Sequence, residues 1–503
     1  MPEKPNEALL RRELGGDMEK DLALMKKALN APLNQDVTVR RFEAGGAAAC
    51  LLFMEGMAGR EAIDQHILRP CLAWKEPLPE TGRADFLRRR VLESESVRAA
   101  SLAGELVESI LSGGTALLID GDSAALLIDT RAFEKRSVGT TMAESVVQGP
   151  QEAFVEALRT NITQIRRILR SELLITELTQ VGRGLPTQVA LLYLRGVAKE
   201  ETVALTRRRL AALDVPLIQG SGQLEQLIED HPFSLFPQML QTERPDRAAA
   251  CLADGQVALL VDGSPYALIA PVTLFHLLHA SDDTFMRWQY GAFLRVVRMA
   301  GALVSLLLPA LYVAVTSYHT HMLPLNLLTS IAETRARVPL PLITEVLFME
   351  ASFYLLNEAG TRIPSQLGSA LGIVGALILG QAAVEASLIS PILIIVVALT
   401  GLGNYSIPNY GVSVGMQMLR LGFVALSAVW GLYGMCLGAW LLCAYLGFMR
   451  SFGEPFLAPA VPRYPHNADL LTRGPMRGRT RRFFMASCRS WLTLDSNEGR
   501  EDR

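Results

Sequence analysis

The sequence predicts an α/β soluble N-terminal half of two related subdomains, followed by an α-helical polytopic membrane bundle. Half of the 503 residues are hydrophobic, yet 19% are charged, which suits a chain with one soluble and one membrane part. Residues 1–295 mix charges freely, whereas residues 299–449 contain no Lys and no Asp. A strand–turn–strand pattern also occurs twice in the first part.

The membrane part is predicted from the length and apolar composition of its segments, because a membrane-spanning helix needs roughly 20 mostly apolar residues. Three segments meet this condition: 299–318, 366–388 and 421–449. A fourth segment, 338–357, is a weaker candidate because it contains two carboxylates. Residues 391–403 are too short for a plain crossing, and the Asn-Tyr-Ser-Ile-Pro-Asn run after them is not helical in pattern. We therefore expect a re-entrant or broken element at 391–411.

Arginines flank the membrane part on both sides, and positive flanks favour the cytosol. The charged start of the chain has no signal-peptide pattern, so we expect both termini to be cytosolic. An even number of crossings follows. Four fits the strong segments, and six is the alternative if 391–403 crosses and 412–449 splits near Gly431.

The subdomain prediction comes from two matching pairs of segments. Residues 115–128 and 256–269 each read as two short strands joined by an Asp-Gly turn, a hairpin signal. Upstream, residues 47–68 and 187–210 each read as a strand followed by an amphipathic helix. A helix with 3.6-residue periodicity at 152–169 opens the second unit. Two unrelated units with similar hairpins are the alternative.

These patterns divide the chain into six parts. They are an N-terminal helical extension at 1–44, subdomains at 45–145 and 146–275, a juxtamembrane linker at 276–298, the transmembrane domain at 299–449, and an Arg-rich cytosolic tail at 450–503.

Enzyme and nucleic-acid functions have little support. The net charge of −2 does not favour nucleic acid, and the six cysteines form no CxxC pair. The sequence has no Walker A, GxGxxG or HExxH motif. A GxSxG match at 411–415 lies between membrane segments, where a nucleophile elbow is not expected. We expect no catalytic residues, no cofactor and no metal site.

The unusual side chains are polar groups at membrane depth, which are costly there and mark functional positions. The Gly-rich segment 366–388 predicts close helix packing or a pore-lining helix, two alternatives that the sequence leaves open. Candidate pore-lining residues are Gly372, Val374, Gly375, Leu377, Ile378, Gln381 and Glu385. Candidate intramembrane polar residues are Glu345, Glu350, Asn404 and Asn409, with a surface polar face as the alternative for the two glutamates and a helix-breaking role as the alternative for the two asparagines.

Several long motifs resemble the A subunits of bacterial spore germinant receptors. They lie, in the family's order, at 144–161, 165–168, 233–238, 243–246, 261–266, 308–314, 372–376, 380–385, 390–393 and 450–456. The resemblance covers about residues 90–460. Gln148 and Gln151 depart from the basic residues of the family's Val-x-Arg-Gly-Pro-Arg signature.

The resemblance implies a multi-pass protein of the spore inner membrane that works with a transporter-like B subunit and a lipoprotein C subunit. It also implies a homo-oligomeric ring that forms a nutrient-gated ion channel. In that reading, Glu385 and Gln381 line the pore, and Val374, Leu377 and Ile378 form an apolar constriction. The alternatives are a non-conducting scaffold, the related AF protein of the stage V sporulation operon, and a carrier with a site at 391–411.

Overall fold

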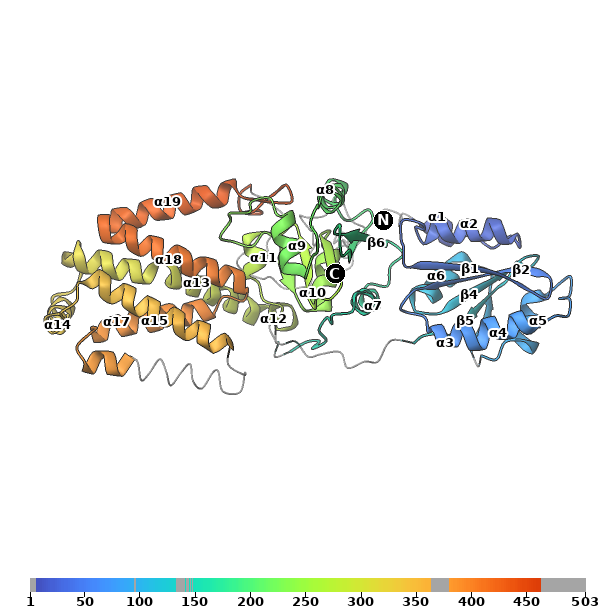
Figure 1. The fold of residues 1–503 in the computed structure, drawn as a ribbon, viewed down its shortest axis with the longest axis horizontal. Coiled ribbons are helices and arrows are strands. Elements are labelled where there is room, and N and C mark those ends of the chain that lie inside the picture. The colour runs from blue at the N-terminus through green and yellow to red at the C-terminus, as the bar shows by residue number, and fades with distance from the viewer. Residues whose placement is uncertain are drawn as a thin grey trace, which may run out of the picture.

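A computed structural model describes residues 6–94, 96–132, 141, 144, 146, 148–362 and 380–462. Three parts lie in a line along the long axis of the molecule (Figure 1). A first α/β unit stands at one end, a second α/β unit in the middle, and a helical domain at the other end. The predicted fold class is therefore confirmed.

The first unit is a five-stranded antiparallel sheet in the order β1-β2-β4-β5-β3. Its strands are β1 (Val37–Ala44), β2 (Ala47–Met54), β3 (Val97–Ala100), β4 (Thr115–Ile119) and β5 (Ala125–Ile128). Its helices are α1 (Glu7–Leu10), α2 (Met18–Ala28), α3 (Arg60–Ile63), the π-helix η1 (Asp64–Leu68), α4 (Arg69–Ala73), α5 (Arg83–Arg90) and α6 (Ala103–Leu111). Residues of α2 and α6 pack on one face of the sheet, and those of α3, α4 and α5 pack on the other. Two apolar cores result, because alternate residues of a strand face opposite sides.

The second unit has a sheet of the same design, in the order β6-β7-β9-β10-β8. Its strands are β6 (Leu174–Val181), β7 (Thr187–Leu194), β8 (Leu240–Thr242), β9 (Val257–Val261) and β10 (Ala267–Ala270). Its helices are α7 (Leu158–Ile168), α8 (Glu200–Ala211), α9 (Ser221–Ile228), α10 (Pro245–Ala253) and α11 (Leu274–Leu278). Leu51 pairs with Leu117 in the first sheet as Leu191 pairs with Leu259 in the second. The predicted relation between the two subdomains is confirmed by this shared strand order.

Three predicted details of the α/β half need correction. The boundary at residue 45 falls between β1 and β2, which pair along their whole length, so the first unit begins before it. The segment 1–44 is no separate extension, because α2 packs into the core of this unit. The helix predicted at 152–169 begins only at Leu158. Edge strands β1, β3, β6 and β8 were not predicted.

The two α/β units are joined by a buried ion pair. Nε of Arg166 on α7 lies 2.7 Å from Oδ2 of Asp36 in the first unit. Nη2 of the same arginine donates to Oδ1 of Asn34 at 2.8 Å and to the Thr176 hydroxyl at 2.9 Å. A planar guanidinium satisfied on several sides holds its partners in one geometry. The contact thus fixes how the two units meet.

The helical domain follows α12 (Asp282–Phe285) and is built around α13. Its helices are α13 (Trp288–Ser317), the 3₁₀-helix η2 (Thr320–Met322), α14 (Leu325–Arg335), α15 (Leu342–Arg362), a segment at 380–385, α17 (Pro391–Tyr405), α18 (Tyr410–Trp430) and α19 (Leu432–Phe448). Helix α13 packs against α17, α18 and α19, and α14 lies across the far end (Figure 1). Within the described residues, α13 and α18 are long and apolar enough to cross a membrane, by length and composition.

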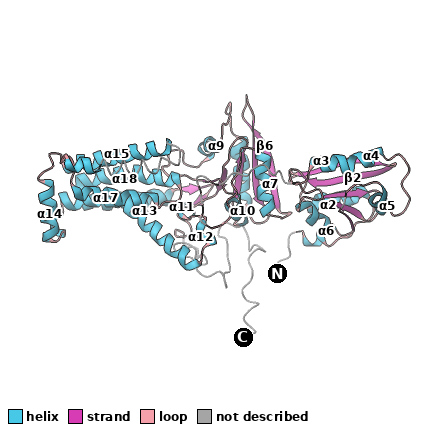
Figure 2. Cartoon of the chain, turned by 90° about the horizontal axis from the view of Figure 1, so that it is seen from below, coloured by secondary structure: helices cyan, strands magenta, loops and turns pink. Residues whose placement is uncertain are grey.

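The helical domain also corrects the predicted segments. Residues 421–449 are not one helix; the alternative of a split near Gly431 is correct, because the chain reverses there with a φ of 58° that glycine adopts readily. The break predicted at 391–411 is narrower, since regular helices end at Tyr405 and restart at Tyr410. Helix α13 begins inside the predicted linker, and its first turns extend toward α12 (Figure 2).

The predicted tail does not start as a free segment. A small hairpin of β11 (Arg450–Ser451) and β12 (Glu454–Pro455) returns to the second α/β unit. There Phe452 and Phe456 are buried in its two cores. The Arg-rich part of the tail, from residue 463, lies outside the described residues. The chain therefore enters and leaves the helical domain at the same end.

Candidate functional site

A buried arginine ties together three helices of the helical domain. Arg420 on α18 is fully buried, and its Nη2 lies 3.0 Å from Oε2 of Glu350 on α15. The same nitrogen is 3.4 Å from the hydroxyl of Tyr354, one turn further along α15. Tyr354 donates in turn to the backbone carbonyl of Gln417 on α18 at 2.7 Å. Charge and hydrogen bonds therefore hold α15 against α18.

The third helix is α13, and its proline explains the contact. Pro309 has no N–H, so the carbonyl of Ser305, four residues earlier, lacks its helical partner. Nη1 of Arg420 donates to that carbonyl at 3.4 Å. Further along, the hydroxyl of Ser427 donates to the carbonyl of Ala310 at 2.6 Å. Arg420 of α18 thus satisfies the carbonyl that the proline leaves without a partner, as neighbouring helices commonly do at such breaks, and Ser427 adds a second contact between the two helices.

A second buried carboxylate lies nearer the far end of the domain. Oε2 of Glu345 accepts the backbone N–H of Ser390 at 3.2 Å, while Oε1 is 3.8 Å from Nε of Arg335 on α14. The Ser390 hydroxyl caps α17 by accepting the N–H of Leu393, and it lies 3.4 Å from the Tyr312 hydroxyl on α13. Glu345 therefore sits where α13, α14, α15 and α17 meet.

The alternative of a surface polar face for the two glutamates is wrong. Both are buried, with exposures of 0% and 1%, and they project roughly 140° apart on α15 toward different arginines. Neither pair is complete. Among the described residues, Oε1 of Glu350, Oε1 of Glu345 and Nε of Arg420 have no hydrogen-bond partner. Buried polar atoms left unsatisfied are costly, so these pairs are poised to gain from rearrangement or from a bound ion or water.

The two predicted asparagines flank the break between α17 and α18. Asn409 is the N-cap of α18, and its Oδ1 accepts the N–H of Val412 at 3.1 Å. Asn404 is buried near the end of α17, with Oδ1 3.5 Å from the Ser305 hydroxyl. Asn409 thus shapes the chain break, whereas Asn404 adds a polar atom beside the Arg420 site.

The predicted pore-lining residues divide into two groups. Gln381 and Glu385 lie on the segment 380–385, where Nε2 of the glutamine donates to Oε1 of the glutamate at 3.0 Å. Both side chains are exposed on the surface of the helical domain. The remaining candidates lie outside the described residues: Gly372, Val374, Gly375, Leu377 and Ile378.

Comparison with known proteins identifies the family. The family model described as Bacillus/Clostridium GerA spore germination protein matches residues 23–484. The chain belongs to this GerA family. The resemblance to germinant receptor A subunits inferred from the sequence motifs is confirmed.

The relatives of this GerA-family chain cover most of its length. Spore germination protein KA of Bacillus subtilis (strain 168) is 34% identical over 448 residues, which are 88% of this chain and 82% of that protein. Spore germination protein A1 of the same organism is 38% identical over 380 residues, or 76% of this chain and 79% of that protein. The uncharacterized membrane protein YfkQ, again from Bacillus subtilis (strain 168), is 34% identical over 449 residues, or 89% and 87%.

A solved structure is also similar. It is the crystal structure of the N-terminal domain of the A subunit of the Bacillus megaterium spore germinant receptor GerK3. The two are 28% identical, with 52% of this chain and 96% of that chain covered and a TM-score of 0.38.

The GxSxG match has a structural role in the GerA-family chain. A loop of the second α/β unit, residues 231–237, rests on the first turns of α18. A Cβ at Gly415 would lie 2.4 Å from the carbonyl oxygen of Leu235, and one at Gly411 would lie 3.1 Å from the Pro237 ring. Small residues at these two positions let loop and helix approach closely. We therefore assign this motif to docking between the two parts of the chain.

The docking contact is extended by the hairpin after α19. The hydroxyl of Ser451 donates to the carbonyl of Gln238 at 2.7 Å and accepts the N–H of Val272 at 2.9 Å. Lys199 pairs with Glu454, and Arg209 pairs with Asp230 beside the hairpin. The second α/β unit therefore contacts both the start of α18 and the end of α19.

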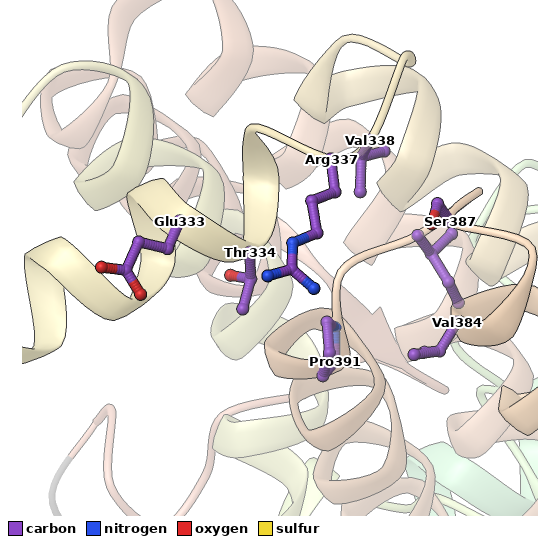
Figure 3. Close-up of a pocket in the computed structure, with 8 residues that line it drawn as sticks. Glu333, Thr334, Arg337, Val338, Val384, Ser387 and Pro391 are labelled. Carbon is purple, nitrogen blue, oxygen red and sulfur yellow. The ribbon is translucent and has the colours of Figure 1, made fainter.

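A small pocket lies at the far end of the helical domain, between α14, the segment before α17 and the start of α17 (Figure 3). Its volume is about 220 Å³, and its polar lining includes Glu333, Thr334, Arg337 and Ser387. The Arg337 guanidinium points into it, toward Thr334 and Pro391 (Figure 3). The pocket lies beside the cap of α17, because Ile389 and Pro391, the two neighbours of Ser390, line it.

A metal site needs several ligand side chains close together, and a reactive thiol needs a lowered pKa. Among the described residues, no three His, Cys, Asp or Glu side chains gather in a way that could hold a metal ion. Burial raises the pKa of the Cys50 thiol to about 11 and that of the Cys251 thiol to about 12. Such thiols stay protonated at neutral pH and are poor nucleophiles.

Sequence reasoning missed the cationic partners. Arg335 and Arg420 were visible as two of the few arginines between residues 299 and 449, but neither was paired with a glutamate. Charges of opposite sign inside an apolar domain are expected to pair with one another. That rule would have indicated a pairing, although the choice of partner depends on how the helices pack.

Proposed function

We propose that this chain is the membrane subunit of a spore germination receptor complex and that copies of it form a nutrient-gated ion channel. It spans the spore inner membrane several times, with both flanks of the helical domain on the cytosolic side. The B and C subunits are its partners. The chain carries no catalytic step in this proposal.

The observation that carries the proposal is the exposed pair of Gln381 and Glu385. In one isolated chain these side chains face outward from an apolar domain. An amide and a carboxylate are costly against lipid, so they are expected to face water or another subunit. A Cβ at Gly380, on the same segment, would lie 3.7 Å from Cδ1 of Ile394 on α17, so the pair stands beside the bundle.

A closed ring of subunits around a water-filled pore provides a surface where these polar side chains can face water. Repeated head-to-tail contacts close into a ring when the rotation between copies permits it. Each copy then contributes one Glu385, and a ring of carboxylates favours cations over anions. The proposal therefore assigns cation selectivity to Glu385, with Gln381 as a neutral polar neighbour.

The buried charge pairs suit a gated domain. Glu350 and Arg420 attract each other, but each keeps one polar atom without a hydrogen-bond partner among the described residues. A second arrangement of α15 and α18 that satisfies these atoms would have a comparable free energy, which is what a two-state element requires. Docking of the second α/β unit on Gly411 and Gly415 of α18 gives the nutrient signal a route to this pair.

The test is to purify the whole chain in detergent, measure its oligomer size, and then follow cation efflux from liposomes that contain it together with its B and C partners. A defined ring and nutrient-dependent efflux support the channel. Glu385→Gln should lower the preference for cations, while the matched change Glu61→Gln, at an exposed site of the first α/β unit, should not. A monomer with no efflux under any condition overturns the proposal.

A non-conducting scaffold is the second candidate. It is favoured by the firm attachment of the two α/β units to each other and to the helical domain. In that case, deletion of the chain would scatter the partner subunits. The reconstituted complex would hold its ion gradient, and the Glu385 substitution would have no effect on selectivity.

A further inference from the structure

The loop at residues 231–237 carries an exposed aromatic side chain at its tip. The side chain of Phe233 is 98% exposed. The loop is braced from inside, because Oε1 of Gln238 accepts the backbone N–H groups of Asp230 and His231 at 3.0 and 2.9 Å. Nε2 of Gln238 donates back to the His231 carbonyl at 2.7 Å. Phe233 is therefore presented by a fixed support.

This support stands beside the last turn of α19. The hydroxyl of Tyr445 donates to Oγ of Ser234 at 3.0 Å. Phe448, the last residue of α19, is 84% exposed. The loop tip and the helix end line a cleft of about 320 Å³ with mostly apolar walls that include Phe233, Phe448 and Met449.

The level of this cleft matches one edge of the apolar zone of the helical domain. Exposed aromatic side chains lie at both ends of α18, which at 21 residues is roughly 31 Å long. Tyr405, Tyr410 and Phe448 lie at the end near the second α/β unit, and Tyr318, Trp430 and Tyr433 lie at the far end, while Trp440 is exposed between them. Hydrocarbon cores are about as thick as this helix is long, and aromatic belts mark both membrane interfaces.

We propose that the loop at residues 231–237 is a lipid anchor. Phe233 inserts next to Phe448 at the boundary between headgroups and acyl chains, and the cleft between them accepts a lipid chain. This inference rests on the membrane position given under the proposed function. A lipid surface is the occupant because the tip continues the exposed apolar surface of α19 at the level of the aromatic side chains near the second α/β unit.

The anchor has a mechanical consequence. The same loop touches Gly415 on α18 through Leu235 and touches α19 through Ser234. The bilayer, the second α/β unit and the α18–α19 pair thus meet at one loop. A movement of this unit changes its contact with the lipid and with the helix that carries Arg420.

The test introduces a fluorescent ring at the tip. The whole chain with Phe233→Trp is placed in bilayers made of ordinary lipid, or of lipid brominated either near the headgroup end or near the tail end of the acyl chain. Bromine quenches tryptophan only at close range. The added emission, relative to the wild type, should lose roughly half or more of its intensity with headgroup-end bromine and much less with tail-end bromine, as befits an interfacial ring.

Leu72→Trp is the matched control, since Leu72 is an exposed apolar residue on α4 of the first α/β unit, at the opposite end of the molecule (Figure 1). Its added emission should not be quenched. The chain has five tryptophans, so the quenching of Trp430 and Trp440 is taken as the difference between the wild type and a variant with Trp430→Phe and Trp440→Phe, and it reports separately whether the helical domain lies in the bilayer. If those two are quenched and Phe233→Trp is not, the anchor is wrong while the membrane assignment stands. The same result together with a cross-link from position 233 to a second copy assigns the tip to a subunit contact and also overturns the anchor.

Discussion

Two buried arginines, one in each half of the molecule, perform different tasks. Arg166 in the α/β half pairs with Asp36 and also donates to Asn34, Thr176 and the carbonyl of Leu174. Arg420 in the helical half pairs with Glu350, but its Nε and one glutamate oxygen have no hydrogen-bond partner among the described residues. The first contact is complete and the second is not.

The difference distinguishes a contact that keeps its two elements rigid from one that an alternative packing can replace. A fully satisfied buried network rigidifies its surroundings, because any movement breaks several bonds at once. A partly satisfied one costs free energy as it stands, so an alternative packing competes with it more easily. The joint between the α/β units is therefore the fixed part, and the contact of α15 with α18 is the adjustable part.

The largest expected effect is at the complete network. Arg166→Met leaves Asp36 buried without its main partner, which should lower the free energy of unfolding by about 3–5 kcal/mol. Arg170→Met, at an exposed position two residues after the end of α7, is the control and should change little. Unfolding of the detergent-solubilised chain by heat or denaturant measures both. Equal effects from the two changes would contradict a structural role for Arg166.

The next largest effect on stability is expected at the incomplete pair of Arg420 and Glu350. Arg420→Met alone strands Glu350 and should cost about 2–4 kcal/mol, whereas Arg420→Met with Glu350→Met should recover most of that loss, because no charge is left buried. Thermal unfolding of the two variants in the same detergent gives the comparison. A double variant as unstable as the single one would mean that the pair is as essential as the Arg166 network.

A smaller effect concerns the contact between the halves. Gly415→Ala places a methyl group 2.4 Å from the Leu235 carbonyl, so the loop must move, at a cost of about 1–3 kcal/mol. Gly422→Ala on the same helix is the control, because a Cβ there meets no atom within 4 Å. Limited proteolysis of the second α/β unit, followed over time, should speed up only for Gly415→Ala. Identical cleavage of both variants would rule out close docking at Gly415.

A further expected effect is a pH dependence in the α/β half. Burial raises the pKa of Glu225 from its ordinary 4.5 to about 7. The folded chain therefore keeps this proton at pH values where the unfolded chain has lost it. The free energy of unfolding should fall as the pH rises from 4.5 to about 7, and it should level off above that.

Glu225→Gln tests whether the Glu225 carboxyl group causes this pH dependence of the free energy of unfolding. The glutamine can still accept the hydrogen bond that Gln241 donates at 2.7 Å, but it does not titrate. Denaturant titrations across the pH range should show a shallower fall for the variant than for the wild type. The same slope in both would mean that Glu225 does not hold its proton in the folded chain.

The sequence was informative where the signal is local. The Asp120-Gly121 and Asp262-Gly263 turns predicted both central hairpins, since such turns favour the twist of paired strands. Edge strands such as β1, with the charged run Arg40-Arg41, carry little apolar periodicity and were missed. Gly431 reverses the chain inside an unbroken apolar run, so the sequence offered a split near Gly431 only as the alternative to one helix over 421–449.

The candidate site shows the same limit. The unusual residues Glu345, Glu350 and Glu385 were visible as carboxylates in an apolar segment. The environments of Glu345 and Glu350 were not, because their partners come from other helices: Arg420 lies 70 residues after Glu350, and the carbonyl of Ser305 is available to Arg420 because of Pro309. Pairing of this kind depends on packing between helices rather than on the order of residues along the chain.

The central claim is that the helical domain conducts cations through a ring lined by Glu385. Its most direct test is the reversal potential of nutrient-evoked current, measured across a planar bilayer with a potassium chloride gradient, for wild type and for Glu385→Gln. The wild type should reverse near the potassium equilibrium potential, and the variant should shift toward zero because the carboxylate ring is gone. Current that reverses at the same potential in both proteins, or no current at all from the assembled complex, would contradict the claim.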